Sequence, residues 1–177
     1  SAKIHNIDLT VIGQNKKLVN YGIKLIWFME YIRNIPGDEL VVFLDGYDCI
    51  ILTDQEEFRN KFHQINNNES DPKKKGLIFS NGKLCLKYNL GIEVNSGMVM
   101  GYCSKFYNLL DKICSKYKCN KEGSCDYLLD KYRGEFILEN TNNLFYNHYV
   151  DGPYKNILTK KSCKNVYDVA NKRVRVK

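Results

Sequence analysis

The 177-residue chain lacks several features that would assign it to a common class of protein. No stretch approaches the roughly 20 consecutive apolar residues of a membrane-spanning helix, and no two of its seven cysteines have the C-x2-C spacing of a zinc ribbon. Internal repeats are absent, and the chain does not open with the basic and apolar regions of a secretory leader. We therefore expect one domain without a membrane span, and we expect any targeting signal of the full gene product to lie outside it.

Clustered charge of one sign is also scarce. The formal net charge is +7, but the only compact basic run is 73–75, which lies beside Asp71, and a looser basic group occupies 172–177. A nucleic-acid-binding surface normally concentrates its Lys and Arg residues on one face. We therefore interpret these charges as solvated surface and expect no nucleic-acid partner.

Short apolar segments alternate with helical patterns along the chain. The patterns predict strands at 7–12, 40–44, 77–80, 95–101, 135–138, 144–146 and 172–176, and helices at 20–32, 54–62, 104–117 and 123–131. Residues 65–75 are expected to form a mobile loop. The first strand, helix and second strand predict a β-α-β unit with a parallel pair and a right-handed crossover. The expected fold class is α/β, with a mixed, mostly parallel sheet flanked by helices on both faces.

Two carboxylates, Asp45 and Asp48, follow the apolar strand at 40–44. In an open α/β sheet, ligands bind beyond the carboxyl ends of the strands. Carboxylate oxygens suit a hard divalent cation such as Mn²⁺ or Mg²⁺, and such a cation commonly neutralises a diphosphate. The segment therefore predicts a metal–nucleotide site.

Five segments in this order resemble the glycosyltransferase domain of the procollagen lysyl hydroxylase and collagen glucosyl/galactosyltransferase family, which has a GT-A-type fold. Residues 20–27 (NYGIKLIW) resemble a family segment that opens a helix near the nucleotide, and 41–48 resemble its strand ending in Asp-x-x-Asp. The other matches are 94–101 (VNSGMVMG), 126–129 (DYLL) and 144–147 (LFYN). The resemblance implies a GT-A-like, Rossmann-type sheet that here lacks terminal strands.

The resemblance also implies roles for individual residues. Asp45 and Asp48 would bind the metal, Mn²⁺ or Mg²⁺, and Asp126 would be the catalytic residue, acting as general base if the transfer is inverting. The residues implied to bind the nucleotide or sugar are Lys24, Leu44, Tyr47, Asn95, Ser96, Gly97 and Asn147.

The implied activity is transfer of a hexose from a UDP-sugar to a hydroxyl, such as that of hydroxylysine or galactosyl-hydroxylysine in a collagen-like chain. The implied location is the secretory pathway, in the endoplasmic reticulum lumen. Residues 1–177 are expected to form a single domain trimmed at both ends, because the family has a strand before the segment matched at Ser1 and a His-containing element after the last strand. Cys125, Tyr127 and Met98 depart from the family pattern.

Each role has a structural alternative. Asp45 would cap a turn, Asp48 would face water, Lys24 would be an exposed helix residue, and Tyr47 would be a half-buried loop aromatic. Asn95, Ser96 and Gly97 would form a plain turn, and Asp126 would lie in the first turn of a helix for its interaction with the helix dipole.

Two other functions compete with sugar transfer. The Phe43–Gly46 segment resembles the nucleophile strand of haloacid-dehalogenase phosphatases, but that chemistry needs a second Asp where Tyr47 stands. The other alternative is a degenerate, non-catalytic module that keeps the fold for scaffolding.

Overall fold

The computed structural model describes residues 1–17, 20, 22–46, 49, 51–82, 94–117, 125–141 and 143–145, and only the backbone of 125–127. The helices are η1 (Ala2–His5), α1 (Ile23–Ile32), α2 (Gln55–Asn68), α3 (Cys103–Lys116), α4 (Cys125–Asp130) and η3 (Arg133–Glu135). The strands are β1 (Leu40–Leu44), β2 (Leu77–Asn81), β3 (Val94–Tyr102) and β4 (Ile137–Glu139). No helix in these ranges is both long and apolar enough to span a membrane.

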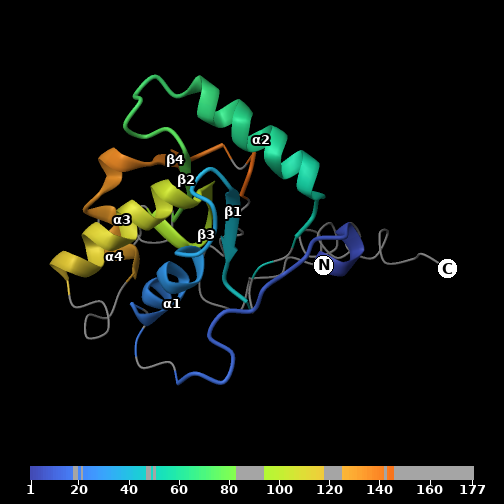
Figure 1. The fold of residues 1–177 in the computed structure, drawn as a ribbon. Coiled ribbons are helices and arrows are strands. Elements are labelled where there is room, and N and C mark those ends of the chain that lie inside the picture. Colours follow the sequence, from blue (N-terminus) through green and yellow to red (C-terminus); the bar gives the residue numbers. More distant parts are fainter. Residues whose placement is uncertain are drawn as a thin grey trace, which may run out of the picture.

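The four strands form one mixed sheet in the order β1-β3-β2-β4. β3 pairs antiparallel with both β1 and β2, and β2 pairs parallel with β4. In the first pairing, Leu40 lies opposite Tyr102 and Leu44 opposite Met98, so β1 ends beside the middle of β3. Helices α1, α3 and α4 lie on one side of the sheet, and α2 lies on the other (Figure 1).

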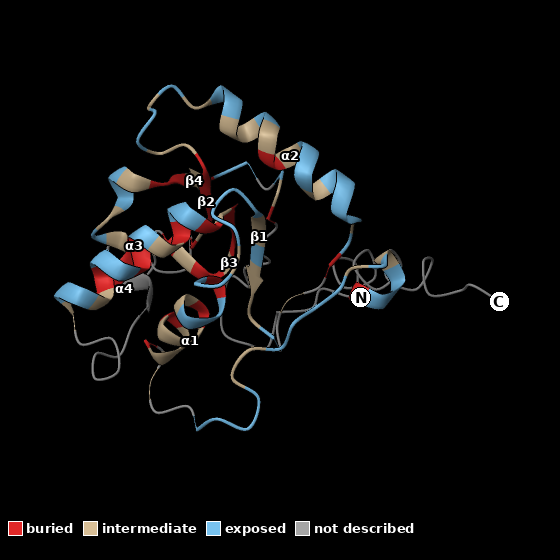
Figure 2. Cartoon of the chain, viewed as in Figure 1, coloured by how far each residue is buried: buried red, intermediate tan, exposed pale blue. Residues whose placement is uncertain are grey.

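Alternation along the strands builds a separate apolar cluster on each face of the sheet. On the face of α1, α3 and α4, Leu77 and Phe79 of β2 pack with Phe28 and Phe106. On the α2 face, the neighbouring Ile78 packs with other buried residues, namely Phe62, Met100, Ile137 and Phe145. Buried residues therefore lie along β2 and β3, while the outer surface of α2 is exposed (Figure 2).

Side-chain hydrogen bonds mark where two of the helices begin. The Asn20 Oδ1 accepts a hydrogen bond of 3.0 Å from the Ile23 backbone N–H at the start of α1. The Asp54 side chain accepts a hydrogen bond of 2.9 Å from the Glu57 N–H, which caps α2 as its sequence predicts.

The Cys103 thiol at the start of α3 is buried. This burial is the larger cause that raises the pKa of the thiol, and the nearby Glu39 charge is the smaller one. Cys103 is therefore a protonated core residue.

The mixed α/β class and the helices on both faces of the sheet are confirmed, but the expectation of a mostly parallel sheet is wrong for the described strands. Residues 7–12 form no strand, so the predicted β-α-β unit is absent. Leu9 and Val11 are 56% and 71% exposed. Their alternating pattern does not produce a strand, because a strand needs a neighbour to take its backbone hydrogen bonds.

Other boundaries also differ from expectation. α2 continues six residues beyond 62, and the predicted loop at 65–75 shortens accordingly to a turn after Asn68. The Gly76 N–H at the end of that turn donates a hydrogen bond of 2.6 Å to the Oδ1 of Asn66 in α2. Residues 144 and 145 are not in a strand, and 172–176 lie outside the described residues.

Candidate functional site

Asp45 is the first residue after β1, and the backbone of β3 holds it in place. Its N–H donates a hydrogen bond of 2.8 Å to the Gly97 carbonyl, which extends the β1–β3 pairing by one residue. The Asp45 side chain is 35% exposed, so its carboxylate lies at the rim of the fold and not in the core. This is the strand-end position that the sequence predicts for a ligand-binding carboxylate.

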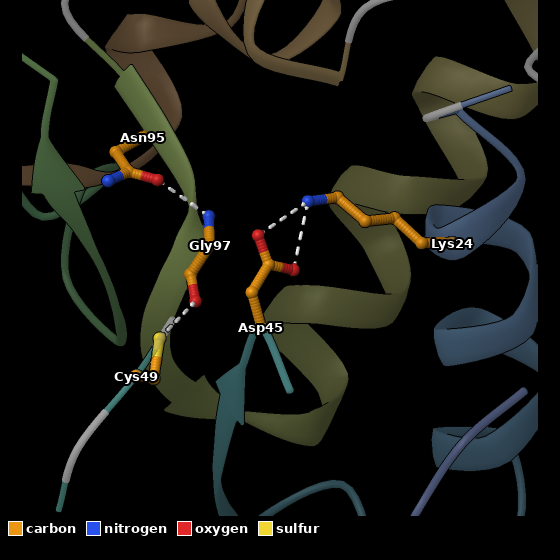
Figure 3. Close-up of polar contacts among 5 residues, drawn as sticks. All are labelled: Lys24, Asp45, Cys49, Asn95 and Gly97. Atoms are coloured by element: carbon orange, nitrogen blue, oxygen red, sulfur yellow. Dashed lines mark hydrogen bonds and ion pairs between the residues drawn. The ribbon is translucent and has the colours of Figure 1, made fainter. Parts of the chain in front are cut away.

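Gly97 allows the carboxylate to lie against β3. A Cβ atom at this position would be 2.7 Å from the Asp45 Oδ2 and 3.0 Å from the Asn95 Oδ1. The Gly97 N–H donates to that same Asn95 oxygen at 2.8 Å, and the Cys49 Sγ lies 3.7 Å from the Gly97 carbonyl oxygen (Figure 3). Any side chain at position 97 would therefore require the Asp45 carboxylate to shift.

Lys24 brings a positive charge to the same place. It is the second residue of α1, and its Nζ lies 3.0 Å from the Asp45 Oδ1 and 3.1 Å from the Oδ2, so both oxygens accept from one ammonium (Figure 3). The Lys24 side chain is 19% exposed. Hydrogen bonds between two charged groups are stronger than neutral ones, so this ion pair orders the end of β1 against α1.

The antiparallel pairing of β1 with β3 explains why distant segments meet here. Residues 45 and 97 are far apart in the sequence, but the end of β1 lies beside the middle of β3. Four predicted residues are therefore brought together: Lys24, Asp45, Asn95 and Gly97 (Figure 3). The sequence did not predict an ion pair between Lys24 and Asp45. It did place a cation and a carboxylate at the same nucleotide site, and this proximity of opposite charges indicated that they could pair.

The structure does not bring the other predicted residues into this group of contacts. The Leu44 side chain packs with the apolar cluster on the α2 face, and Ser96 is only 4% exposed. Asp126 lies in α4, but its side chain is outside the described part. Tyr47, Asp48 and Asn147 also lie outside the described residues. Their roles stay predictions.

Sequence reasoning missed one buried carboxylate. Glu139, at the end of β4, is 4% exposed and accepts hydrogen bonds from the backbone N–H groups of Thr141, Asn143 and Phe145. It also accepts from the Thr141 hydroxyl. These partners of the Glu139 carboxylate come from the six residues that follow it, so the carboxylate fixes the course of the chain after β4. Nothing in the sequence pattern distinguishes it from an exposed Glu.

A divalent cation fits the chemistry at Asp45. Among the described residues, no group of three or more His, Cys, Asp or Glu side chains gathers to hold a metal. Asp45 nevertheless offers two oxygens at the rim, and both already bind a cation in the form of the Lys24 ammonium. Mg²⁺ and Mn²⁺ often need only one or two protein carboxylates, together with phosphate oxygens and water.

Comparison with known proteins identifies the family. A search of curated proteins found no match. A family model described as the PLOD GT domain matches residues 1–123, which include Lys24, Asp45 and Gly97 but not Asp126 or Asn147. The match covers more than half of the chain. The chain therefore belongs to the family of PLOD glycosyltransferase domains, the glycosyltransferase domain of lysyl hydroxylases.

Proposed function

We propose that this domain transfers a hexose from a UDP-sugar to a hydroxyl, and that the reaction depends on a divalent metal. The observation that carries the proposal is the meeting of Asp45, Lys24 and Gly97 at one end of the sheet, inside the stretch that matches a glycosyltransferase family. A carboxylate and an ammonium side by side offer one group for a cation and one for a phosphate.

Asp45 and Asp48 would hold Mn²⁺ or Mg²⁺. When bound, such an ion supplies positive charge that stabilises the departing diphosphate. Lys24 would add a second positive charge beside the same phosphates, and this electrostatic stabilisation requires no proton transfer. Leu44 and Tyr47 would lie beside the nucleotide.

The remaining residues would orient the sugar and the acceptor. Asn95, Ser96 and Asn147 would hydrogen-bond sugar hydroxyls, and Gly97 would let the sugar approach the backbone. In an inverting transfer, the acceptor oxygen forms the new bond to the anomeric carbon as the bond to the diphosphate breaks. Asp126 would take the acceptor's proton, and UDP would leave.

The acceptor we propose is hydroxylysine or galactosyl-hydroxylysine of a collagen-like chain, with the reaction in the endoplasmic reticulum lumen. Membership in the family of PLOD glycosyltransferase domains supports both proposals. The phosphatase alternative gains no support, because the matched family is one of glycosyltransferases.

One observation favours a second candidate, a non-catalytic module that keeps the fold. Lys24 already neutralises Asp45, so this carboxylate is stable without a metal. The sequence also departs from the family pattern at Met98 and Cys125. In this alternative the ion pair only stabilises the end of β1.

Thermal unfolding with MnCl₂ and UDP separates the two candidates. For the transferase we expect the two ligands together to raise Tm more than either alone. At a hundred times Kd the gain is about 2.7 kcal/mol, or roughly 5–10 °C for a chain of this length. Asp45→Asn should abolish the joint effect, whereas Asp38→Asn, at an exposed turn before β1, should retain it. No joint shift in the unaltered protein would favour the non-catalytic module.

A further inference from the structure

We propose that Lys24 takes the place of the metal at Asp45 and moves to the diphosphate when metal and nucleotide arrive together. The metal would then bind tightly only in the presence of the nucleotide. This inference rests on the proposed function, because it assumes that Asp45 is a metal ligand.

The first argument is competition for the same atoms. The Lys24 Nζ contacts both Asp45 oxygens, at 3.0 and 3.1 Å. A divalent cation coordinates carboxylate oxygens at roughly 2.0–2.2 Å, so it and the ammonium would be close neighbours of like charge. Lys24 must therefore withdraw from at least one oxygen before Asp45 becomes a metal ligand.

The second argument is that the ammonium is carried on a longer and more flexible side chain than the carboxylate. The Asp45 backbone is held by its hydrogen bond to the Gly97 carbonyl, and the short side chain lies so close to β3 that a Cβ at position 97 would be 2.7 Å from its Oδ2. Lys24 has a long flexible stem in the first turn of α1, while Leu25, Phe28 and Ile32 anchor the helix in the core. The ammonium can swing at the rim without any movement of α1.

The third argument concerns charge. If Lys24 leaves Asp45 for a metal alone, its ammonium is left beside a divalent ion with no anion to pair with. A diphosphate removes this cost, because its oxygens accept from Lys24 and also neutralise the metal. Metal and nucleotide should therefore each strengthen the binding of the other by the same factor.

The experiment measures binding and needs no turnover. Bound Mn²⁺ is counted from the loss of the electron paramagnetic resonance signal of the free ion, with and without UDP, and UDP binding is measured by calorimetry with and without MnCl₂. For the unaltered chain we expect UDP to tighten Mn²⁺ binding by about tenfold or more.

Removing the ammonium should separate the two binding events. In Lys24→Met we expect Mn²⁺ alone to bind about threefold to tenfold more tightly, because its competitor is gone, and we expect UDP to add little. Lys24→Arg keeps a cation and should behave like the unaltered protein. Lys16→Met is the matched control, since Lys16 pairs with Glu30 at 3.8 Å on the exposed surface. Melting curves verify folding, and Lys24→Gln replaces Lys24→Met if that variant does not fold.

The possible failures are distinguishable. The proposed function is overturned, and this inference with it, if the unaltered chain binds no Mn²⁺ in the presence of UDP. The same holds if the Asp45→Asn variant binds Mn²⁺ as tightly as the unaltered chain does. If binding depends on Asp45 but Lys24→Met binds Mn²⁺ alone no more tightly, only the exchange of Lys24 is overturned.

Discussion

At the scale of single residues, Gly97 decides where the Asp45 carboxylate lies. We expect Gly97→Ala to push this carboxylate away from β3, because the new methyl group would meet the Oδ2 at 2.7 Å. The overpacking should lower the free energy of unfolding by about 1–3 kcal/mol and remove the joint thermal shift with MnCl₂ and UDP. Urea denaturation measures the first effect.

Gly134→Ala is the matched control, since a Cβ at that position has no neighbour within 4 Å. It should change stability by no more than about 0.5 kcal/mol. Equal losses in the two variants would contradict the role assigned to Gly97.

Glu139 is a second residue whose surroundings define its effect. We expect Glu139→Ala to reduce the free energy of unfolding by about 1–3 kcal/mol, because the buried Phe145 N–H and its neighbours lose their acceptor. Glu135→Ala removes a more exposed carboxylate that pairs with Lys112, and should cost less than about 1 kcal/mol. Chemical denaturation of both variants tests the difference, which vanishes if Glu139 is not a buried acceptor.

At the scale of elements, the N-terminal cap of α2 is the most local feature. Asp54→Ala should destabilise the protein by about 1 kcal/mol, because the Glu57 N–H loses its side-chain acceptor. Gln64→Ala, at an exposed position within the same helix, should change stability little. Thermal melts of the two variants measure the contrast. Similar losses of stability in the two variants would mean that the residue composition of α2, and not its N-terminal cap, stabilises the helix.

At the scale of the whole molecule, the sheet separates two apolar clusters that share its strands. Phe62→Leu alters the cluster on the α2 face, and Phe106→Leu alters the other. Each should cost about 1–2 kcal/mol, and the double variant should lose the sum within about 0.5 kcal/mol, because the two phenylalanines belong to clusters with no described residue in common. Urea denaturation of the double-mutant cycle measures this. A large coupling term would show that packing strain passes through the sheet.

The sequence by itself determined the features that depend on neighbouring residues. Asp54 begins α2 because its side chain reaches an N–H three residues later. The apolar segments at 40–44 and 77–80 are strands, and the order of motifs indicated the family that the comparison confirmed. Each of these follows from local hydrogen bonding or from the residue types in one short segment.

Tertiary structure alone decided which segments meet. Residues 7–12 have the pattern of a strand but form none, since they pair with none of the described strands of the sheet. β1 pairs antiparallel with β3, and this pairing places Asp45 against Gly97 and within reach of Lys24. Strand pairing and ion pairing depend on groups far apart in the chain, so no local pattern specifies them.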